Sequence, residues 1–240
     1  MSEILWCADN GDGTYRNPVL YCDYSDPDAI CVNGTYYLTA STFNYVPGLP
    51  ILTSRDLVNW KLRNYAVKNI PEARYAAPQH AQGIWAPAIR FQNGRFYIYY
   101  GMPDEGIYMV RAADACGQWD APKLVRAGKG LIDPCPFWDD DGRAYVIHAY
   151  ANSRIGFKSR IGIFPMSADG THAIGEDKFL FDGTANHPTI EGPKVYKRDG
   201  WCYIFAPAGG VATGWQTVLR SRRIDGEYED RIVLRQGNSR

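Results

Sequence analysis

The stretch DPDAICVNGTYYLTAS, residues 26–41, decides the fold because its pattern recurs three more times along the chain. Each copy has a Pro, a short apolar run, a turn that ends in Gly and then an aromatic-rich run. The turn Gly follows the Pro by seven residues in three copies and by eight in the other. The later copies are APAIRFQNGRFYIYYG (86–101), DPCPFWDDDGRAYVIHAY (133–150) and GPKVYKRDGWCYIFAP (192–207). Such regularity predicts one structural unit that is used four times.

Each copy is typical of a β-hairpin, because an Asn-Gly or Asp-Gly turn supplies the positive φ that a tight hairpin needs. A second strand pair is expected after each hairpin, in residues 51–60, 107–119, 160–172 and 217–229. Four strands every roughly 45 to 60 residues predict the blades of a β-propeller. A β-sandwich is the alternative, although a sandwich does not require this period.

The composition argues against several classes of function. The 26 Lys and Arg balance the 26 Asp and Glu, so a basic field for nucleic acid or for a membrane surface is not expected. No apolar run approaches the roughly 20 residues of a membrane span. The N-terminus is not typical of a signal peptide, so a cytoplasmic protein is expected if Met1 is the native start. The 7 Trp and 17 Tyr fit β-rich packing or sugar-stacking surfaces.

Metal sites and disulfides are not predicted. The six cysteines form no C-x-x-C pair, which argues against a zinc cage. Cys31, Cys135 and Cys202 lie in or beside apolar runs and are expected to be buried thiols. Residues 9–15 and 139–142 mimic fragments of a calcium loop but lack its downstream Glu, so turns are expected there.

The start of each repeat carries the candidate catalytic residues. Asp26 and Asp133 stand directly before the Pro of their units, and Glu191 stands two residues before its Pro. In a propeller these positions converge around one channel, and three carboxyl groups near one axis should raise at least one pKa. An ionised and a protonated carboxyl are what glycoside hydrolysis requires. Asp-Pro as a simple turn start explains one copy well and three copies poorly.

At these residues the chain resembles glycoside hydrolase family 43, whose members are five-bladed β-propellers. The resemblance runs from about Tyr15 to the end of the chain. Within the family, the chain is similar to the β-xylosidase and α-L-arabinofuranosidase subgroup. It implies an all-β, five-bladed β-propeller and a single catalytic domain over residues 1–240. The motifs that carry it are NPVL (17–20), DYSDPDAI (23–30), SRDLVNW (54–60), GIWAPAI (83–89), LIDPCPFWDDDGRAY (131–145) and IEGPKVY (190–196).

The resemblance also implies a role for each acid. Asp26 resembles the general base, Glu191 the general acid, and Asp133 the third acid, which orients Glu191 and raises its pKa. The implied mechanism is a single displacement with inversion, for which base and acid lie roughly 6.5–9.5 Å apart. Trp85 resembles the aromatic wall of the terminal-sugar subsite, and Phe43 resembles a second apolar wall. No cofactor is required, and for Trp138 a packing role is expected.

The sequence departs from the family pattern at its end. Residues 228–240 are interpreted as the start of a fifth blade, which is left incomplete. The usual axial histidine finds no equivalent among His80, His148, His172 and His187. A structural calcium in the channel is implied by the family, with its usual anchor in the missing part. The chain is therefore expected to be a truncated fragment rather than a natural short form, and to be poorly active alone.

The expected function is an inverting glycoside hydrolase that releases xylose or arabinofuranose from xylan- or arabinan-type oligosaccharides. The alternatives are a non-catalytic carbohydrate-binding propeller and an inactive fragment. A protein-interaction propeller is disfavoured by the three acids. The choice between xylose and arabinose, exo or endo action, and the oligomeric state stay open.

Overall fold

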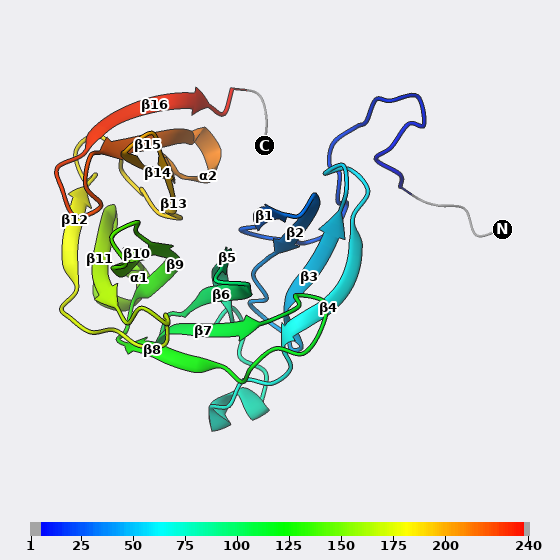
Figure 1. Ribbon diagram of the computed structural model, residues 1–240, viewed down its shortest axis with the longest axis horizontal. Coiled ribbons are helices and arrows are strands. Elements are labelled where there is room, and N and C mark those ends of the chain that lie inside the picture. The colour runs from blue at the N-terminus through cyan, green and yellow to red at the C-terminus, as the bar shows by residue number, and fades with distance from the viewer. Residues whose placement is uncertain (1–5, 238–240) are drawn as a thin grey trace.

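The computed structural model describes residues 6–237, which form four antiparallel four-stranded sheets, each in simple chain order. Figure 1 shows these blades around a common centre, with β1, β5, β9 and β13 innermost and the ring open between the fourth and first blades. Blade 1 comprises β1 (Asp28–Val32), β2 (Thr35–Thr39), β3 (Gly48–Ser54) and β4 (Lys61–Val67). Blade 2 comprises β5 (Trp85–Gln92), β6 (Arg95–Met102), β7 (Gly106–Ala112) and β8 (Lys123–Ala127).

Blade 3 comprises β9 (Leu131–Trp138), β10 (Ala144–Tyr150), β11 (Arg160–Met166) and β12 (Lys178–Asp182). Blade 4 comprises β13 (Lys194–Arg198), β14 (Trp201–Ala208), β15 (Trp215–Ser221) and β16 (Glu229–Arg235). Three short helical segments lie in the connections: η1 (Ala73–Ala76), α1 (Asn152–Ile155) and α2 (Gly210–Thr213). The predicted all-β propeller architecture is confirmed by these blades.

The turns of the innermost hairpins explain why the repeat is so regular. Val32 pairs with Thr35, and the two residues between them have positive φ, 49° at Asn33 and 72° at Gly34. Both values suit the turn that matches the twist of a tight hairpin. The pairs Asn93-Gly94 and Asp199-Gly200 repeat this geometry. The third hairpin closes differently, with Gly142 N–H donating to the Asp139 carbonyl, which accounts for its extra residue.

The C-terminal segment corrects one prediction. Residues 228–240 were expected to begin a fifth blade, but β16 pairs with β15 as the outermost strand of the fourth blade. A similar offset occurs in the other blades, because in blades 1 to 3 the fourth strand begins after the segment in which a strand pair was expected, and in blade 4 it begins at the last residue of that segment. Blade 1 is an example, where β4 begins at Lys61. Residues 238–240 lie outside the described part of the chain.

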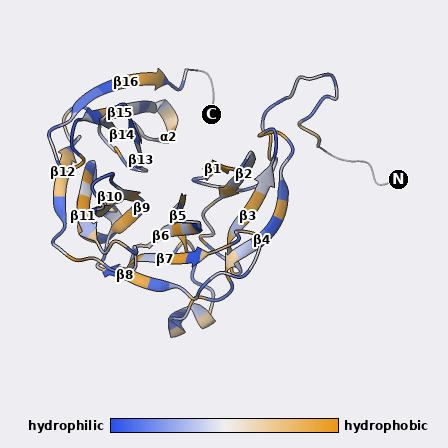
Figure 2. Cartoon of the chain, in the orientation of Figure 1, coloured by the Kyte–Doolittle hydropathy of each residue, from blue (hydrophilic) through white to orange (hydrophobic). Residues whose placement is uncertain are grey.

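The core lies between neighbouring blades. One buried apolar cluster joins blades 1 and 2, a second joins blades 2 and 3, and a third joins blades 3 and 4. Figure 2 shows bands of hydrophobic residues on the strands of the blades. Tyr99 and Tyr100 on β6 are the largest fully buried side chains. Burying a large apolar side chain stabilises the fold by about 1.5–3 kcal/mol, so the blade interfaces hold the inner strands in place.

A chain of buried polar contacts crosses the axis and ties the four inner strands together. Asp28 Oδ2 on β1 accepts hydrogen bonds from the Ile89 backbone N–H at 2.9 Å and from the Arg90 guanidinium at 2.7 Å. Arg90 also contacts Cys135 Sγ on β9 at 3.0 Å, and this sulfur accepts the Val195 N–H of β13 at 3.3 Å. These bonds fix the relative positions of the strands whose upstream ends carry the acids.

Three minor predictions have mixed outcomes. All six cysteines are free, and Cys135 and Cys202 are buried, but Cys31 is exposed. The expectation for Cys31 was wrong because β1 has only one face against the core, and Cys31 points to the other. Trp138 packs against Tyr97 with ring centroids 5.0 Å apart, which confirms its packing role. No helix within residues 6–237 is long and apolar enough to cross a membrane.

Candidate active site

The inner ends of the four blades line a cavity of about 420 Å³. Its wall contains the residues that the sequence singled out: Asp26, Phe43, Trp85, Asp133 and Glu191. Asp26 lies just before β1, Trp85 begins β5, Asp133 lies within β9 and Glu191 precedes β13. The structure therefore brings together, from all four blades, every site residue expected from the repeat and from the family resemblance.

Asp26 and Asp133 share an uncommon backbone conformation. Their φ angles are 48° and 54°, in the left-handed region that few non-glycine residues adopt and that Asp tolerates better than most. Backbone strain of this kind costs on the order of 1–3 kcal/mol and is concentrated at functional sites. Since each Asp directly precedes the Pro of its unit, the shared conformation gives the two equivalent carboxyl groups the same starting direction.

Asp26 is held by its own blade. Its Oδ2 accepts a hydrogen bond from the Ser41 hydroxyl at 2.8 Å, and the Ser41 backbone N–H donates to the Ser25 carbonyl at 2.9 Å. Ser41 follows β2, so the β1–β2 hairpin carries both partners. The carboxylate remains exposed at the cavity mouth, where a water molecule can reach it.

Asp133 is the most enclosed of the three acids. It is 6% exposed, and its Oδ2 accepts the Gly192 backbone N–H at 2.8 Å. Burial raises the pKa of Asp133 to about 7, and the nearby charge of Glu191 adds to the increase. The Gly192 hydrogen bond and the Lys194 ammonium act in the opposite direction. Because Gly192 directly follows Glu191, Asp133 anchors the backbone that presents Glu191.

Glu191 lies on a well-anchored segment. Its backbone N–H donates to the Pro207 carbonyl at 3.1 Å, and Thr189 N–H donates to Ser159 Oγ at 2.8 Å. Partial desolvation raises the pKa of Glu191, and the charge of Asp26 raises it further, whereas Lys158 lowers it. Two of the three acids thus have raised pKa values, in keeping with the expectation that crowded carboxyl groups do not all ionise together.

The aromatic walls stand nearly perpendicular to one another. The rings of Phe43 and Trp85 have centroids 5.8 Å apart at an interplanar angle of 76°. Trp85 Nε1–H donates to the Ala81 carbonyl at 3.2 Å, and the Arg154 guanidinium lies 5.3 Å from the centre of its ring. A ring held by both a hydrogen bond and a cation is well ordered, as an apolar platform for a sugar requires.

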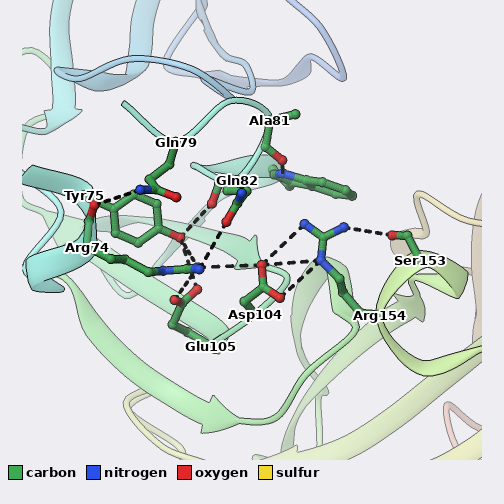
Figure 3. Close-up of polar contacts among 10 residues, drawn as sticks. Arg74, Tyr75, Gln79, Ala81, Gln82, Asp104, Glu105, Ser153 and Arg154 are labelled. Carbon is green, nitrogen blue, oxygen red and sulfur yellow. Dashed lines mark hydrogen bonds and ion pairs between the residues drawn. The ribbon is translucent and has the colours of Figure 1, made fainter. Parts of the chain in front are cut away.

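Arg154 belongs to an ion-pair network that joins blades 2 and 3 to the connection before β5, as Figure 3 shows. Arg154 pairs with Asp104 in the β6–β7 turn at 3.2 Å, and Asp104 lies 3.6 Å from Arg74 in η1. Arg74 also pairs with Glu105 at 2.5 Å. These contacts join the loop before β5 to α1 of blade 3 and keep the surroundings of Trp85 rigid.

Several residues of the site escaped the sequence analysis. Lys194, Phe205, Pro207 and Gln216 also line the cavity. Lys194 directly follows the Pro of the fourth unit, and its ammonium donates to the Pro87 carbonyl at 3.1 Å. The position one residue beyond the Pro holds a charged side chain in two of the four repeats, Asp28 and Lys194, and this signal could have drawn attention to Lys194. The loop before β15 that brings Gln216 to the cavity gives no comparable signal.

Within residues 6–237, no group of three or more His, Cys, Asp or Glu side chains is arranged so that it could hold a metal ion. In the first calcium-like segment, Asp9 Oδ1 accepts the Gly11 N–H at 2.8 Å and Asp12 Oδ1 accepts the Thr14 N–H at 2.9 Å. These carboxylates stabilise their own turns, as expected. The structural calcium implied by the family resemblance stays a prediction.

Three carboxyl groups and two aromatic walls line one cavity where the inner ends of the four blades meet. The chain belongs to the glycosyl hydrolases family 43, whose family model matches residues 15–238. The resemblance inferred from the sequence is therefore confirmed.

Individual relatives of this chain are consistent with the family assignment. A putative beta-xylosidase of Xylanibacter ruminicola is 45% identical over 233 residues, which are 97% of this chain and 42% of the relative. A non-reducing end alpha-L-arabinofuranosidase of Bacteroides ovatus is 32% identical over 234 residues, covering 94% of this chain and 42% of the relative. The crystal structure of a xylan beta-1,4-xylosidase from Bacillus halodurans has a TM-score of 0.76 at 29% identity, covering 90% of this chain and 43% of that one. The chain thus spans about 42% of the length of the curated relatives that it matches.

Proposed function

We propose that this propeller hydrolyses O-glycosidic bonds in xylan- or arabinan-type oligosaccharides and releases xylose or arabinofuranose with inversion. The observation that carries the proposal is the convergence of Asp26, Asp133 and Glu191 on one cavity, with the pKa raised for two of them. The names of the relatives, beta-xylosidase and alpha-L-arabinofuranosidase, support the sugar class. A propeller that only binds carbohydrate needs aromatic walls but no acid with a raised pKa.

Glu191 is the general acid in this proposal. Its raised pKa keeps the carboxyl protonated closer to neutral pH, and it reaches solvent in the cavity, where a glycosidic oxygen can approach. The pKa of Asp133 is raised to about 7, but Asp133 is almost fully buried and bonded to Gly192. It therefore acts as a positioning residue, which holds the backbone next to Glu191 and adds little negative charge below pH 7.

Asp26 is the general base. The Ser41 hydroxyl fixes one carboxylate oxygen, which leaves the other to accept a proton from water. As that water attacks the anomeric carbon, Glu191 donates its proton to the departing oxygen on the other side of the sugar. Water adds to one face while the bond on the opposite face breaks, so the configuration inverts. Phe43 and Trp85 offer apolar surface to the face of the terminal sugar.

The test is turnover of xylobiose and of arabinofuranosyl oligosaccharides, with proton NMR used to identify the first anomer released. We expect α-xylose from a β-xyloside. Glu191→Gln should lower kcat on the natural oligosaccharide by about 10³-fold, because general acid catalysis typically contributes factors of this order. With a dinitrophenyl glycoside, whose leaving group needs little protonation, the loss should be much smaller.

Glu176→Gln provides the matched control. The Glu176 side chain is 91% exposed and pairs only loosely with Arg126, at 3.9 Å, so both substrates should be turned over normally. Release of the retained anomer would contradict inversion. An equal loss on both substrates would contradict the role of Glu191 as acid, and binding of oligosaccharide without any turnover would favour a carbohydrate-binding propeller.

A further inference from the structure

A second cavity lies beside the candidate active site on blade 4. Its volume is about 380 Å³, and it shares Glu191, Pro207 and Gln216 with the first cavity. Its remaining wall comes from the β14–β15 connection and from the end of β16. Its lining includes Glu191, Trp215, Gln216 and Arg235. The two cavities therefore adjoin each other at the residue proposed to act as the acid.

The positions of Asp26 and Glu191 indicate on which side of the reacting sugar this cavity lies. In an inverting displacement the base and the leaving group lie on opposite sides of the reacting sugar. Asp26, the base, projects from blade 1, whereas Glu191 projects from blade 4. The leaving group must depart on the side of Glu191, and the cavity that continues past Glu191 away from blade 1 is this second one.

Another cavity, of about 490 Å³, adjoins Phe43 between blades 1 and 2. It shares no acid with the active-site cavity and lies on the side from which water would attack. It therefore fits the leaving group less well, and the choice falls on the cavity of blade 4.

Trp215 is the main aromatic surface of the second cavity and is held in place. Its ring lies against the backbone of Gly209, where an added Cβ would be only 2.4 Å from Trp215 Cζ3. Gly209 also has a φ of 81°, so glycine is required twice over at this position. Close packing on a bare backbone fixes the plane of the indole before any ligand arrives.

A buried histidine fixes the same ring at its edge. Trp215 Nε1–H can only donate, so His187 Nδ1, 3.2 Å away, is the acceptor. The His187 proton therefore sits on Nε2, which faces Asp230 Oδ2 at 2.7 Å. Thr217 Oγ1 also lies 3.1 Å from Nδ1. His187 is 2% exposed and stands four residues before Glu191, so one network orients Trp215 and supports the segment of the acid.

We infer that the second cavity is the leaving-group subsite, in which Trp215 stacks against the sugar ring released on the far side of the scissile bond. This inference rests on the proposed function. An aromatic platform with fixed orientation, the Gln216 amide and the Arg235 guanidinium is the chemistry that recognises a pyranose ring and its hydroxyl groups. The Arg235 guanidinium lies 6.0 Å from the centre of the Trp215 ring, at the rim of the cavity.

The test compares two substrates that differ only in the leaving group. Xylobiose releases a sugar, whereas β-xylosyl fluoride releases a fluoride ion that needs no leaving-group subsite; the arabinofuranosyl counterparts serve if that is the sugar turned over. Trp215→Ala should lower kcat/KM for the disaccharide by about tenfold, the effect of losing roughly one stacked apolar face. For the fluoride, kcat/KM should stay within about twofold.

Arg235→Ala is a second variant that does not depend on repacking, because Arg235 lies on the exposed strand β16. It should lower kcat/KM for the disaccharide by about threefold and leave the fluoride unaffected. Trp201→Ala is the matched control, since Trp201 lies at the opposite end of blade 4, stacked under Arg222 at 3.7 Å. Both substrates should be turned over normally by this variant.

An equal loss on both substrates, or no loss on either, would overturn the leaving-group subsite while normal turnover by the unmodified protein keeps the proposed function intact. A lowered melting temperature of Trp215→Ala with both activities preserved would likewise overturn it, because Trp215 would then pack against protein rather than sugar. Failure of the unmodified protein to hydrolyse either substrate would overturn the proposed function and this inference together.

Discussion

Blades 2 and 4 are built from the same repeat but differ in how they are buried. In β6, every residue after Arg95 is buried, whereas β14 alternates between buried residues and residues that are half-buried or exposed. Tyr99 and Phe205 occupy equivalent places, five residues beyond the turn Gly, yet Tyr99 is 0% exposed and Phe205 is 38% exposed. Blade 2 packs between two neighbours, whereas the described residues place a neighbour on only one side of blade 4.

The comparison bears on function because the acids are divided between the two environments. Asp133 lies on blade 3, which packs on both sides, and its burial raises its pKa. Asp26 and Glu191 lie on blades 1 and 4, on either side of the opening in Figure 1. In the proposed function, the two acids that exchange protons with water and substrate are the exposed ones, Asp26 and Glu191, and the positioning acid Asp133 is the enclosed one.

The largest effect on stability is expected where the two blades differ most in burial, at Tyr99 and Phe205. Tyr99→Ala should lower the free energy of unfolding by about 3–5 kcal/mol, because it leaves a cavity between blades 2 and 3. Phe205→Ala should cost only about 1 kcal/mol, since much of that ring already meets solvent. Urea denaturation followed by circular dichroism measures both values. Ile98→Val and Ile204→Val are the paired controls, and because both isoleucines are 0% exposed, similar losses are expected.

If Phe205→Ala proved as destabilising as Tyr99→Ala, the two side chains would be equally buried in solution. That outcome would contradict the difference in burial between blades 2 and 4.

An intermediate effect on stability is expected from replacing Asp133, the buried acid. The pKa of Asp133 is about 7 in the folded protein, above its ordinary value of 3.8, so the folded state holds a proton that the unfolded state releases. Stability should therefore fall as pH rises from about 4 to 7 and then level off. Asp133→Asn removes this dependence. Relative to the unmodified protein, it should gain about 2–3 kcal/mol of stability between pH 5 and pH 8.

Parallel denaturation curves at the two pH values measure that gain. Asp140→Asn serves as the control for replacing a carboxyl group with an amide at an exposed position of the same blade. A constant stability difference for Asp133→Asn across this range would show that Asp133 is ionised in the fold.

The smallest effect is expected on the pH profile of activity, from replacing Lys158, which is exposed and influences Glu191. Lys158 is exposed and lowers the pKa of Glu191. Lys158→Gln should therefore move the alkaline limb of the kcat/KM profile upward, because the acid keeps its proton to higher pH. Solvent screening keeps this shift small, and added salt should reduce the influence of Lys158 in the unmodified protein. Lys178→Gln, at the start of the outer strand of blade 3, should leave the limb in place; a downward shift for Lys158→Gln would contradict the assignment.

Much of the site could be predicted because it lies on the repeat. The Pro-to-Gly spacing located the four inner hairpins, and the residues before each Pro gave Asp26 and Asp133. Trp85, Phe43 and the roles of the acids required the family resemblance in addition. The outer strands were harder, since β16 is exposed throughout and its sequence is equally consistent with the first strand of another blade.

The sequence by itself determined the hairpins, the four-fold repeat and the acids at its start, because turn geometry and strand periodicity are local properties. Tertiary structure alone decided that the pKa rises at Asp133 and at Glu191, since burial and neighbouring charges come from other blades. It also decided that Gln216 and Trp215 lie beside Glu191, and that Cys31 faces outward. These properties depend on which surfaces meet across the propeller axis, and no stretch of a single strand encodes that.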